Sequence, residues 1–307
     1  MSRYIARRLL LAIPVLIGAS FFIFFLVYAL PGDPIRALAG DRPLPPGVVA
    51  ELRDLYNLDD NVFVQYAKYI GGLLQGDLGI DFSGRPVSET ISDRLPITTR
   101  LAITALVIEG VIGLIAGILA GIRRGGYLDN LVLVSTTFLI SIPVFVLGFS
   151  LQYFLGVRLS LFPVSGANEG WYSYILPGFV LASASMAYVA RLLRTSLAEN
   201  LRNDYVRTAR AKGLPERLVI GKHTLRNSLI AVVTFLGADF GTLMGGAIIT
   251  EGIFNLPGLG RAVFDAVRSQ EGTVVVGITT FLVFVYIFFN LVADVLYAAL
   301  DPRIRYD

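Results

Sequence analysis

The chain has 307 residues, of which 55% are hydrophobic and only 16% are charged, and its mean hydropathy is +0.68. An ordinary soluble domain carries about 25% charged residues, so this composition excludes a typical water-soluble protein and indicates one that lies in a membrane. The net charge of +3 comes from basic residues that gather beside apolar runs, which argues against nucleic-acid binding, and the absence of cysteine with a single histidine excludes disulfides, thiolate chemistry and a histidine-rich metal site.

Six segments have the length and apolar character to cross a bilayer, which takes about 20 residues in a helix. They are 9–30, 101–122, 131–156, 174–190, 229–250 and 273–300. The fourth is the weakest, because it is short and carries Pro177 and two serines. The first follows three arginines and resembles a signal peptide, but its uncharged run of 22 residues is longer than a signal core of about 7–15 residues. We therefore expect a retained span.

The charges on the connecting segments predict the orientation. With the N-terminus inside, the cytoplasmic segments 1–8, 123–130, 191–228 and 301–307 hold 16 Lys and Arg against 6 acidic residues. The opposite segments hold 10 Lys and Arg against 14 acidic residues. Cytoplasmic loops carry the excess of basic residues, so both termini are expected in the cytoplasm.

The region 31–100 is the main segment outside the cell. It opens with the proline-rich "PGDPIRALAGDRPLPPG", and "VVAELRDLYNL" and "FVQYAKYIGGLLQG" then place apolar residues at helical spacing. We expect a small folded element that rests on the membrane. A disordered linker is the alternative, but the aromatic residues and the periodicity argue against it.

Glycines recur at every fourth position in two of the expected spans. They are Gly113, Gly117 and Gly121 in the second span, and Gly237, Gly241 and Gly245 in the fifth. This spacing places them on one face of a helix, where they allow a second helix to approach closely. Close helix packing is the favoured interpretation, and a pore-lining role is the alternative.

Three acidic residues, Glu109, Asp239 and Asp294, lie within expected spans. A charge in hydrocarbon is costly and is by default a functional hypothesis, such as a proton or ion relay. The alternative is that these side chains face a polar interior or pair within the protein, and that Asp294 lies near the cytoplasmic interface. No basic residue shares their depth in any span, so the second interpretation is favoured.

The basic stretch "NDYVRTARAKGLPERLVIGKHTLRNSL" lies in the cytoplasmic loop 191–228. Asn203 or Asp204 is a suitable N-cap, and Gly213 is a suitable helix C-terminus. Pro215 and Glu216 suit the first turn of a second helix, which is expected to continue into the fifth span. The stretch therefore predicts a helix, a tight turn and a helix. A protein-docking element fits this shape better than an amphipathic helix that lies on lipid.

This stretch resembles the cytoplasmic "EAA" loop of ABC-transporter permeases. Ala209, Gly213 and Leu225 fit that pattern, whereas Arg207 stands at the position of its glutamate. "DYVRTARAKGL" followed by "HTLRNSL" resembles the variant of the dipeptide/oligopeptide permease branch, in the subunit with the long first outer loop. "RYIARRLLLAIPVL", "ALPGDP", "GDLG", "RLPITTRLA" and "LDPRIRY" are similar to that branch in the same order, so the resemblance covers essentially the whole chain.

The resemblance implies an all-α, polytopic fold, with residues 1–307 forming one permease domain of the type I ABC importer architecture in a bacterial cell membrane. It implies a second, homologous permease as a heterodimer partner, two cytoplasmic ATPase subunits and an extracytoplasmic substrate-binding protein, besides membrane lipid. The chain itself has no phosphate-binding loop, because "IGKH" at 220–223 lacks both the first glycine and the Ser/Thr. We therefore expect no catalytic residue, metal or cofactor in this chain, with ATP and Mg bound by the ATPase.

The resemblance also assigns candidate site residues. The helix 204–212 is expected to contact the ATPase as a coupling helix, although generic anchoring by positive charge is an alternative. The candidate coupling residues are Asp204, Arg207, Thr208, Ala209, Arg210, Gly213 and Leu225.

Outside the cell, "EGIFNLPGLGRAVFDAV" resembles the outer loop that follows the coupling region in these permeases. Glu251, Asn255, Pro257, Gly258 and Gly260 match its motif and are expected at the binding-protein contact or close to the path. A structural turn held by proline and glycine is the equally weighted alternative.

The expected function is uptake of dipeptides and oligopeptides. Related systems move nickel chelates, glutathione or oligosaccharides, so another small solute is an alternative. An ion-coupled secondary transporter is disfavoured because no internal repeat is evident and the basic loop would have no role. An intramembrane protease is disfavoured because His223 is cytoplasmic and the acidic residues in the spans show no pairing signature.

Overall fold

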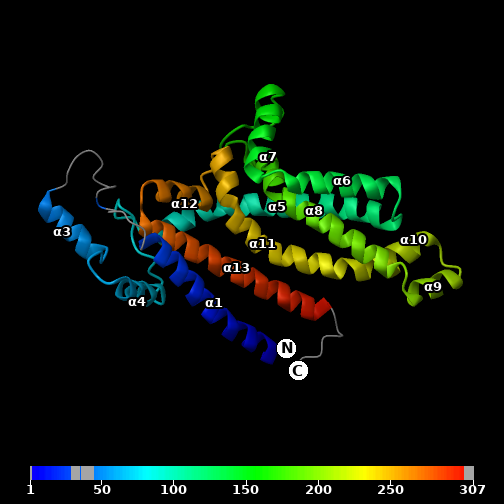
Figure 1. Cartoon of the computed structure of the whole chain (residues 1–307), viewed down its shortest axis with the longest axis horizontal. Coiled ribbons are helices and arrows are strands. Elements are labelled where there is room, and N and C mark those ends of the chain that lie inside the picture. Colours follow the sequence, from blue (N-terminus) through cyan, green and yellow to red (C-terminus); the bar gives the residue numbers. More distant parts are fainter. Residues whose placement is uncertain (1, 29–34, 36–44, 301–307) are drawn as a thin grey trace.

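The apolar runs of the sequence fold as helices, as expected in lipid, where backbone groups must be satisfied within the segment. The computed structural model describes residues 2–28, 35 and 45–300, and within these residues the fold is all-α. The first half contains α1 (Ser2–Tyr28), α3 (Pro46–Leu55), α4 (Val62–Leu73), α5 (Val87–Ile122), α6 (Tyr127–Ser141), α7 (Val144–Leu151), the π-helix η1 (Gln152–Arg158) and the 3₁₀ helix η2 (Gly170–Tyr174). The second half contains α8 (Ile175–Asn200), α9 (Asp204–Ala211), α10 (Glu216–Leu218), the π-helix η3 (Val219–Leu225), α11 (Arg226–Phe254), α12 (Leu259–Arg268) and α13 (Gly272–Leu300) (Figure 1).

Five helical runs among the described residues are long and apolar enough to span a membrane. They are Ala6–Tyr28, Val87–Ile122, Gly170–Asn200, Glu216–Phe254 and Gly272–Tyr297. A sixth apolar run is divided between α6 and α7, which meet at an angle of 99°. The five runs correspond to five of the six expected spans.

The expected span over residues 131–156 is bent, because Pro143 divides it into α6 and α7. Proline lacks the amide hydrogen that a helix needs, and it restricts the preceding residue to an extended conformation. Ile142 accordingly has φ −89° and ψ 122°, and α7 begins after Pro143 in a new direction. In Figure 1, α7 projects away from the other helices.

The most extensive helix contact in the bundle joins α5 to α8. A Cβ atom on Gly117 would lie 2.7 Å from the Leu193 Cβ and 2.8 Å from the Ala190 carbonyl oxygen. One turn away on either side, Gly113 and Gly121 meet the backbone and side chains of α8 at similarly short distances. All three glycines are buried. The two helices thus approach so closely that no other side chain fits between them.

The glycines of α11 are less uniform. A Cβ on Gly241 would lie 2.9 Å from the Tyr286 Cα on α13, so this position is also a close helix contact. Gly237 lies at ordinary van der Waals distance from Leu296 and Ala293 on α13. Gly245 faces open space, with no atom within 4 Å of its ideal Cβ position.

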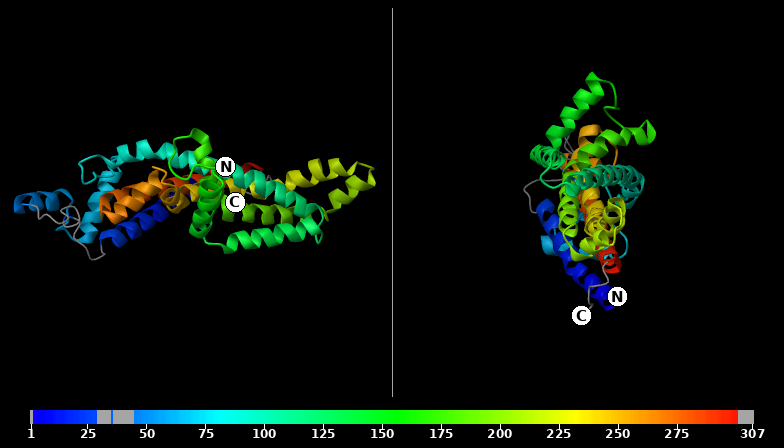
Figure 2. Two further views of the ribbon diagram at one scale, coloured as in Figure 1. Left: turned by 90° about the horizontal axis from the view of Figure 1, so that it is seen from above. Right: turned by 90° about the vertical axis from the view of Figure 1, so that its right-hand side faces the viewer.

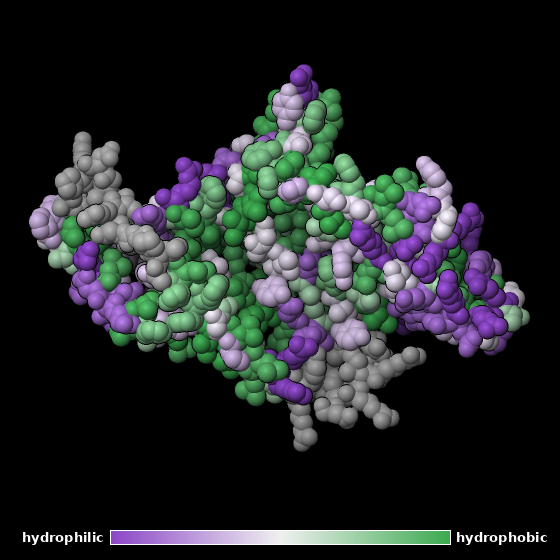
Figure 3. Space-filling view, in the orientation of Figure 1, coloured by the Kyte–Doolittle hydropathy of each residue, from purple (hydrophilic) through white to green (hydrophobic). Residues whose placement is uncertain are grey.

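The two ends of the elongated bundle have different structures. Helices α9 and α10 form one end, and α3, α4 and α12 lie toward the other (Figure 1). Figure 2 shows that the remaining helices gather around this long axis. Apolar residues cover much of the middle of the surface, and polar residues concentrate at the α9–α10 end (Figure 3). The basic loop, which is expected in the cytoplasm, therefore forms one tip of the molecule.

The acidic residue nearest to the cytoplasm, Asp294, pairs with a basic residue of the first helix. The Arg8 Nη2 donates to the Asp294 Oδ1 at 3.0 Å, and both side chains are partly exposed. This contact joins the cytoplasmic parts of α1 and α13, which pack along each other. The terminal segment 301–307 and the proline-rich residues 29–34 and 36–44 lie outside the described residues.

Substitution of Gly117 by alanine tests the α5–α8 contact. The added methyl group must displace Leu193 or the Ala190 backbone, so we expect a loss of about 1–3 kcal/mol in stability, measured by denaturation in mixed micelles. The matched control is Gly18→Ala in α1, where no atom lies within 4 Å of the new methyl group. Equal stabilities of the two variants would contradict the close contact.

Candidate functional sites at the two ends of the bundle

The cytoplasmic loop is attached to two spanning helices through Asn200, the last residue of α8. The Asn200 Nδ2 donates to the Ser228 Oγ at the start of α11 at 3.1 Å. The Asn200 Oδ1 accepts a hydrogen bond from the Tyr205 hydroxyl on α9 at 2.9 Å. Because Ser228 is buried, the link between α8 and α11 is shielded from water. One side chain thus connects α8, α9 and α11.

Helix α9 begins after Asn203, as expected, and packs one apolar face against the chain itself. Val206 and Ala209 on α9 form a small buried cluster with Val219 of η3. Ala209 is only 6% exposed. Its small side chain therefore allows α9 to approach the following helix of the same chain, and it does not lie on the exposed surface of the loop.

The turn after α9 has the geometry that the sequence predicts. Gly213 has φ +77°, a left-handed conformation that favours glycine. Its amide donates to the Arg210 carbonyl, and the Leu214 amide donates to the Ala209 carbonyl, which is the Schellman pattern that ends helices. The Arg210 guanidinium also spans the turn, since its Nη2 lies 2.6 Å from the Glu216 Oε1. Arg210 is therefore engaged within the loop.

The outward face of α9 carries three of the candidate coupling residues. The side chains of Asp204 and Arg207 are 95% and 76% exposed, and they form only a weak pair at 3.4 Å. Thr208 is exposed and bonds to the backbone of its own helix. Most donors and acceptors of these polar side chains are exposed and not used within the chain. They form a surface at the tip of the molecule that a partner protein can contact.

The second helix of the loop continues into the membrane through a π-helical segment. In η3 the Thr224 hydroxyl donates to the Val219 carbonyl at 2.9 Å, and both residues are buried. Such segments are rare and are often found at functional sites. Leu225 at the end of η3 packs against Leu193 and Val232, so it belongs to the α8–α11 contact. The helix from Glu216 to Phe254 is thus continuous over 39 residues.

A buried ion pair braces the cytoplasmic end of α8. The Arg194 Nη2 donates to the Asp129 Oδ2 of α6 at 2.8 Å, and the Arg194 Nε donates to the other carboxylate oxygen. The Gly125 amide donates to the same carboxylate at 2.7 Å. The Asp129 side chain is 1% exposed, so removal of either charged partner would leave a buried unpaired charge.

At the outer end, Glu251 lies in a fully buried position where three helices meet. Its Oε2 accepts a hydrogen bond from the Arg261 amide in the first turn of α12 at 2.9 Å. Its Oε1 accepts from the Thr98 hydroxyl of α5 at 2.7 Å. The same hydroxyl oxygen accepts from the Leu259 amide at 2.8 Å. The first amides of a helix lack partners within it and favour a negative group, so Glu251 and Thr98 together cap α12.

The two motif glycines make room for this carboxylate. A Cβ on Gly258 would lie 2.2 Å from the Glu251 Oε1. A Cβ on Gly260 would lie 2.4 Å from the Ile248 Cα and 3.0 Å from the Glu251 Oε2. Asn255 and Pro257 are exposed in the link between α11 and α12, and Asn255 has φ +49°. The structure thus brings Glu251, Gly258 and Gly260 together and leaves Asn255 and Pro257 on the surface.

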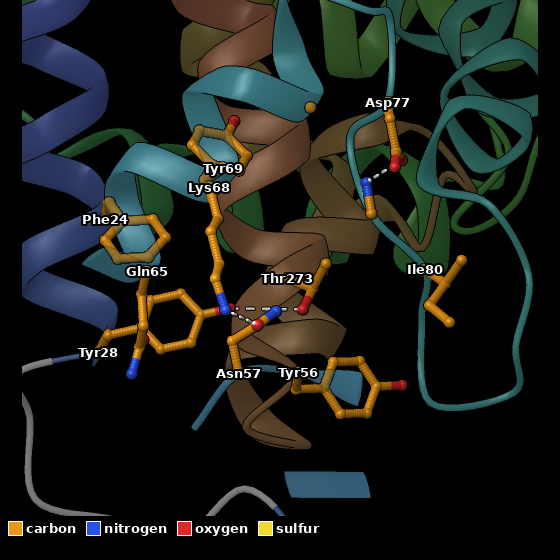
Figure 4. Close-up of a pocket in the computed structure, with 12 residues that line it drawn as sticks. Phe24, Tyr28, Tyr56, Asn57, Gln65, Lys68, Tyr69, Asp77, Ile80 and Thr273 are labelled. Atoms are coloured by element: carbon orange, nitrogen blue, oxygen red, sulfur yellow. Dashed lines mark hydrogen bonds between the residues drawn. The ribbon is translucent and has the colours of Figure 1, made fainter. Parts of the chain in front are cut away.

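The described part of the outer region 31–100 is folded. Phe21 and Phe24 of α1 pack against Tyr66 of α4, and Tyr69 also contacts Phe24. Figure 4 shows a cavity of about 300 Å³ beside this contact, which is lined by Phe24, Tyr28, Tyr56, Asn57, Gln65, Lys68, Tyr69, Gly72, Asp77, Gly79, Ile80 and Thr273. Burial raises the pKa of Tyr69 to about 12, so its hydroxyl keeps its proton.

The other two acidic residues of the spans lie together inside the bundle. Glu109 on α5 and Asp239 on α11 are 0% and 7% exposed, and their carboxyl groups are neighbours. Neither forms an ion pair with any residue that the structure describes. The described residues also contain no group of three or more acidic or histidine side chains placed to hold a metal ion.

Sequence reasoning missed several residues that organise these sites. Asn200, Asp129 and Arg194 stand outside the recognised motifs, and Thr98 and Ser228 lie within "RLPITTRLA" and "HTLRNSL" but received no role. Their long-range partners are 28 to 161 positions away in the sequence, so no local spacing reveals these contacts.

Comparison with known proteins gives consistent matches over the whole chain. The family model described as "Binding-protein-dependent transport system inner membrane component" matches residues 113–306. A model for the N-terminal part of such membrane components matches residues 1–102. The chain is 42% identical over 308 residues to the glutathione transport system permease protein GsiC of Escherichia coli (strain K12), with 100% of both chains covered. It is 41% identical over 307 residues to GsiC of Salmonella paratyphi A, again with 100% of both chains covered.

The fold also resembles a solved transporter structure. An inward-facing structure of the MetNI methionine ABC transporter (CY5 native crystal form) matches with a TM-score of 0.56 and 19% sequence identity. The match covers 70% of this chain and 97% of the other. At this identity the likeness concerns the fold alone.

A double-mutant cycle tests the carboxylate cap of α12. Gly258→Ala places a methyl group against the Glu251 carboxylate, so we expect a loss of about 1–3 kcal/mol in stability. In a Glu251→Ala background that space is free, and the same glycine substitution is expected to cost no more than about 0.5 kcal/mol. Denaturation of all four variants in mixed micelles measures the coupling. Strictly additive losses would show that the carboxylate does not occupy this site.

Proposed function

The chain belongs to the family of inner-membrane components of binding-protein-dependent transport systems, and on this premise we propose that it couples a translocation path to a cytoplasmic ATPase. It is a multi-pass permease subunit of an ABC importer in the bacterial inner membrane.

The observation that carries the coupling proposal is the exposed polar face of α9 at the cytoplasmic tip. Asp204, Arg207 and Thr208 project from a helix whose opposite face is fixed to its own chain by Val206 and Ala209. A helix that is anchored on one face and free on the other suits a groove in a partner protein. ATP hydrolysis belongs to that partner, which is expected to be present in two copies.

The connection of α9 to the spans suggests how force is transmitted. The Schellman turn at Gly213 and the Arg210–Glu216 pair fix the angle between α9 and the next helix. That helix continues into α11, and Asn200 ties its base to α8. Displacement of α9 by the ATPase would therefore move α8 and α11. Movement of these helices switches access to the path from one side of the membrane to the other.

The outer region is proposed to receive the substrate-binding protein. Helix α4 and the residue that follows it present apolar side chains to the exterior, among them Phe63 at 64% exposure and the C-cap residue Leu74 at 84%. The helix rests on α1 through aromatic contacts, so it offers a fixed surface. The outer link with Asn255 and Pro257 is also exposed.

A second, homologous permease is proposed to complete the path. Each subunit then supplies one half of the path, as in a heterodimer. Helix α5 keeps one apolar face exposed in the isolated chain, with Val107, Val111 and Ile115 all more than half exposed. This face is available for lipid or for the second permease.

The proposed substrates are short peptides. Two relatives that cover the whole chain are named as glutathione transport permeases, and glutathione is itself a modified tripeptide. The substrate-binding protein is expected to select among peptides, so this chain would provide a permissive path. Uptake of another small solute, such as a nickel chelate or an oligosaccharide, is the second candidate.

Two charge-introducing variants, one at each end of the molecule, test the two docking proposals against each other. Arg207→Glu is expected to reduce substrate-stimulated ATP hydrolysis of the assembled transporter by about tenfold and to leave capture of the binding protein unchanged. Leu74→Glu is expected to weaken capture of the binding protein by about tenfold and to leave the ATPase attached. Both quantities are measured on each variant in nanodiscs.

Arg123→Glu serves as the cytoplasmic control, because Arg123 is an exposed arginine in the other cytoplasmic turn. It should leave both readouts at the wild-type level. If Arg207→Glu and Arg123→Glu behave alike, the coupling role of α9 is wrong. If Leu74→Glu captures the binding protein normally, the docking role of α4 is wrong.

A further inference from the structure

We propose that Glu251 is a positioning residue of the transport cycle, which holds α12 to the outer ends of α11 and α5 so that the three move as one body. The inference rests on the proposed function for the source of the movement, but the joint itself is a property of this chain. Glu251 contributes through the position of α12 and not through contact with substrate.

The hydrogen bonds at Glu251 are directional and fully buried. Each carboxylate oxygen accepts one bond, from the Thr98 hydroxyl at 2.7 Å and from the Arg261 amide at 2.9 Å. Glu251 and Thr98 are both 0% exposed, so no water replaces a lost partner. Removal of a buried acceptor leaves the remaining donors unsatisfied, which costs more than the net energy of one hydrogen bond. The arrangement therefore has one strongly favoured geometry.

Apart from the bond between the Leu259 amide and the Thr98 hydroxyl, the other contacts of α12 are apolar and less specific in direction. Its buried face, with Leu259 and Val263, packs against Val87 and Ile91 of α5 and against Ile278 of α13. Apolar burial stabilises this contact but is not directional, so it tolerates sliding and rotation. The covalent link to α11 consists only of residues 255–258. The carboxylate is thus the group that fixes the orientation of α12.

Helix α11 connects this joint to the coupling loop without a break. The helical run Glu216–Phe254 has 39 residues, which corresponds to about 58 Å at 1.5 Å per residue. Its cytoplasmic base is tied to α8 by the bond between Asn200 and Ser228. Glu251 lies one turn before its outer end. A displacement that begins at α9 therefore reaches Glu251 through a single continuous helix.

A displacement of α12 would change a surface outside the cell, because one face of this helix is exposed. Phe264 is 44% exposed and Val267 is 58% exposed. The guanidinium groups of Arg261 and Arg268 lie 5.9 and 6.0 Å from the centre of the Phe264 ring. Movement of α12 would reposition this arginine–phenylalanine–arginine surface. It would also reshape the cavity of about 220 Å³ that α12 shares with Arg85 and the N-terminal part of α5.

Distance measurements between two spin labels test the joint directly. The chain contains no cysteine, so Val233→Cys on α11 and Val267→Cys on α12 provide a clean pair at exposed positions. We measure the intact transporter, with both permeases and the ATPases, in nanodiscs without nucleotide and with trapped ATP. The wild-type pair is expected to give one narrow distance distribution with the same mean in both states.

Glu251→Ala is expected to broaden that distribution in both states. The fraction of molecules in which α12 is detached from α11 should rise about tenfold. Glu251→Gln is the matched control, because its amide oxygen can accept from Arg261 while its amide nitrogen donates to Thr98. It should retain the narrow distribution. Glu251→Ala should also lose substrate uptake while basal ATP hydrolysis persists, which a general loss of folding would not produce.

If Glu251→Ala does not assemble, the milder pair Thr98→Val and Thr98→Ser replaces it, with broadening expected only for the valine variant. A narrow, unchanged distribution in Glu251→Ala or Thr98→Val would overturn the inference, and so would a wild-type distance that shifts with ATP.

A second label pair, Leu10→Cys on α1 and Lys212→Cys after α9, reports the movement of the coupling loop that ATP is proposed to drive. If that distance is the same with and without ATP, the proposed coupling is wrong. The distributions measured without nucleotide then still show whether Glu251 holds α12 to α11.

Discussion

The close approach of α5 and α8 is the contact on which the rest of the bundle depends. In a bilayer, an apolar side chain gains little free energy by moving from lipid into a contact between helices. Helices therefore associate through dense packing of small residues. Gly113, Gly117 and Gly121 allow this packing because each brings the α5 backbone against α8. Helix α6 is then attached to α8 by the Asp129–Arg194 pair, and α11 packs on the same two helices. Helices α5 and α8 together form a stable base against which the other spans pack.

Helix α11 connects this base to both candidate functional sites. It runs from the cytoplasmic loop to the outer loop, and directional hydrogen bonds hold it at both ends, through Ser228 at one end and Glu251 at the other. In the proposed mechanism, the energy for movement enters from a partner ATPase. The exposed polar face of α9 and the long continuous helix behind it form a physical route for that energy. In the proposed mechanism the permease transmits movement from one side of the membrane to the other.

Local sequence patterns predicted much of the fold, whereas long-range contacts remained hidden. The apolar runs, the glycine stripe of α5 and the turn at Gly213 follow from rules that act within a few residues. The 99° bend at Pro143 was missed, because the apolar run continues across it. Ala209 and Leu225 were recognised by motif, but the structure directs both toward the chain itself. The role of Glu251 depends on Thr98, which is 153 positions away, so spacing alone could not distinguish a cap from a docking residue.

Uptake by the reconstituted transporter is the measurement that tests the central claim most directly. This chain is combined in proteoliposomes with its second permease, its ATPases and its binding protein, and a defined mixture of short peptides is offered outside. Mass spectrometry identifies which peptides enter. The account predicts uptake that requires ATP on the cytoplasmic side and persists when the proton gradient is collapsed. Uptake that follows the proton gradient and continues without ATP would contradict it.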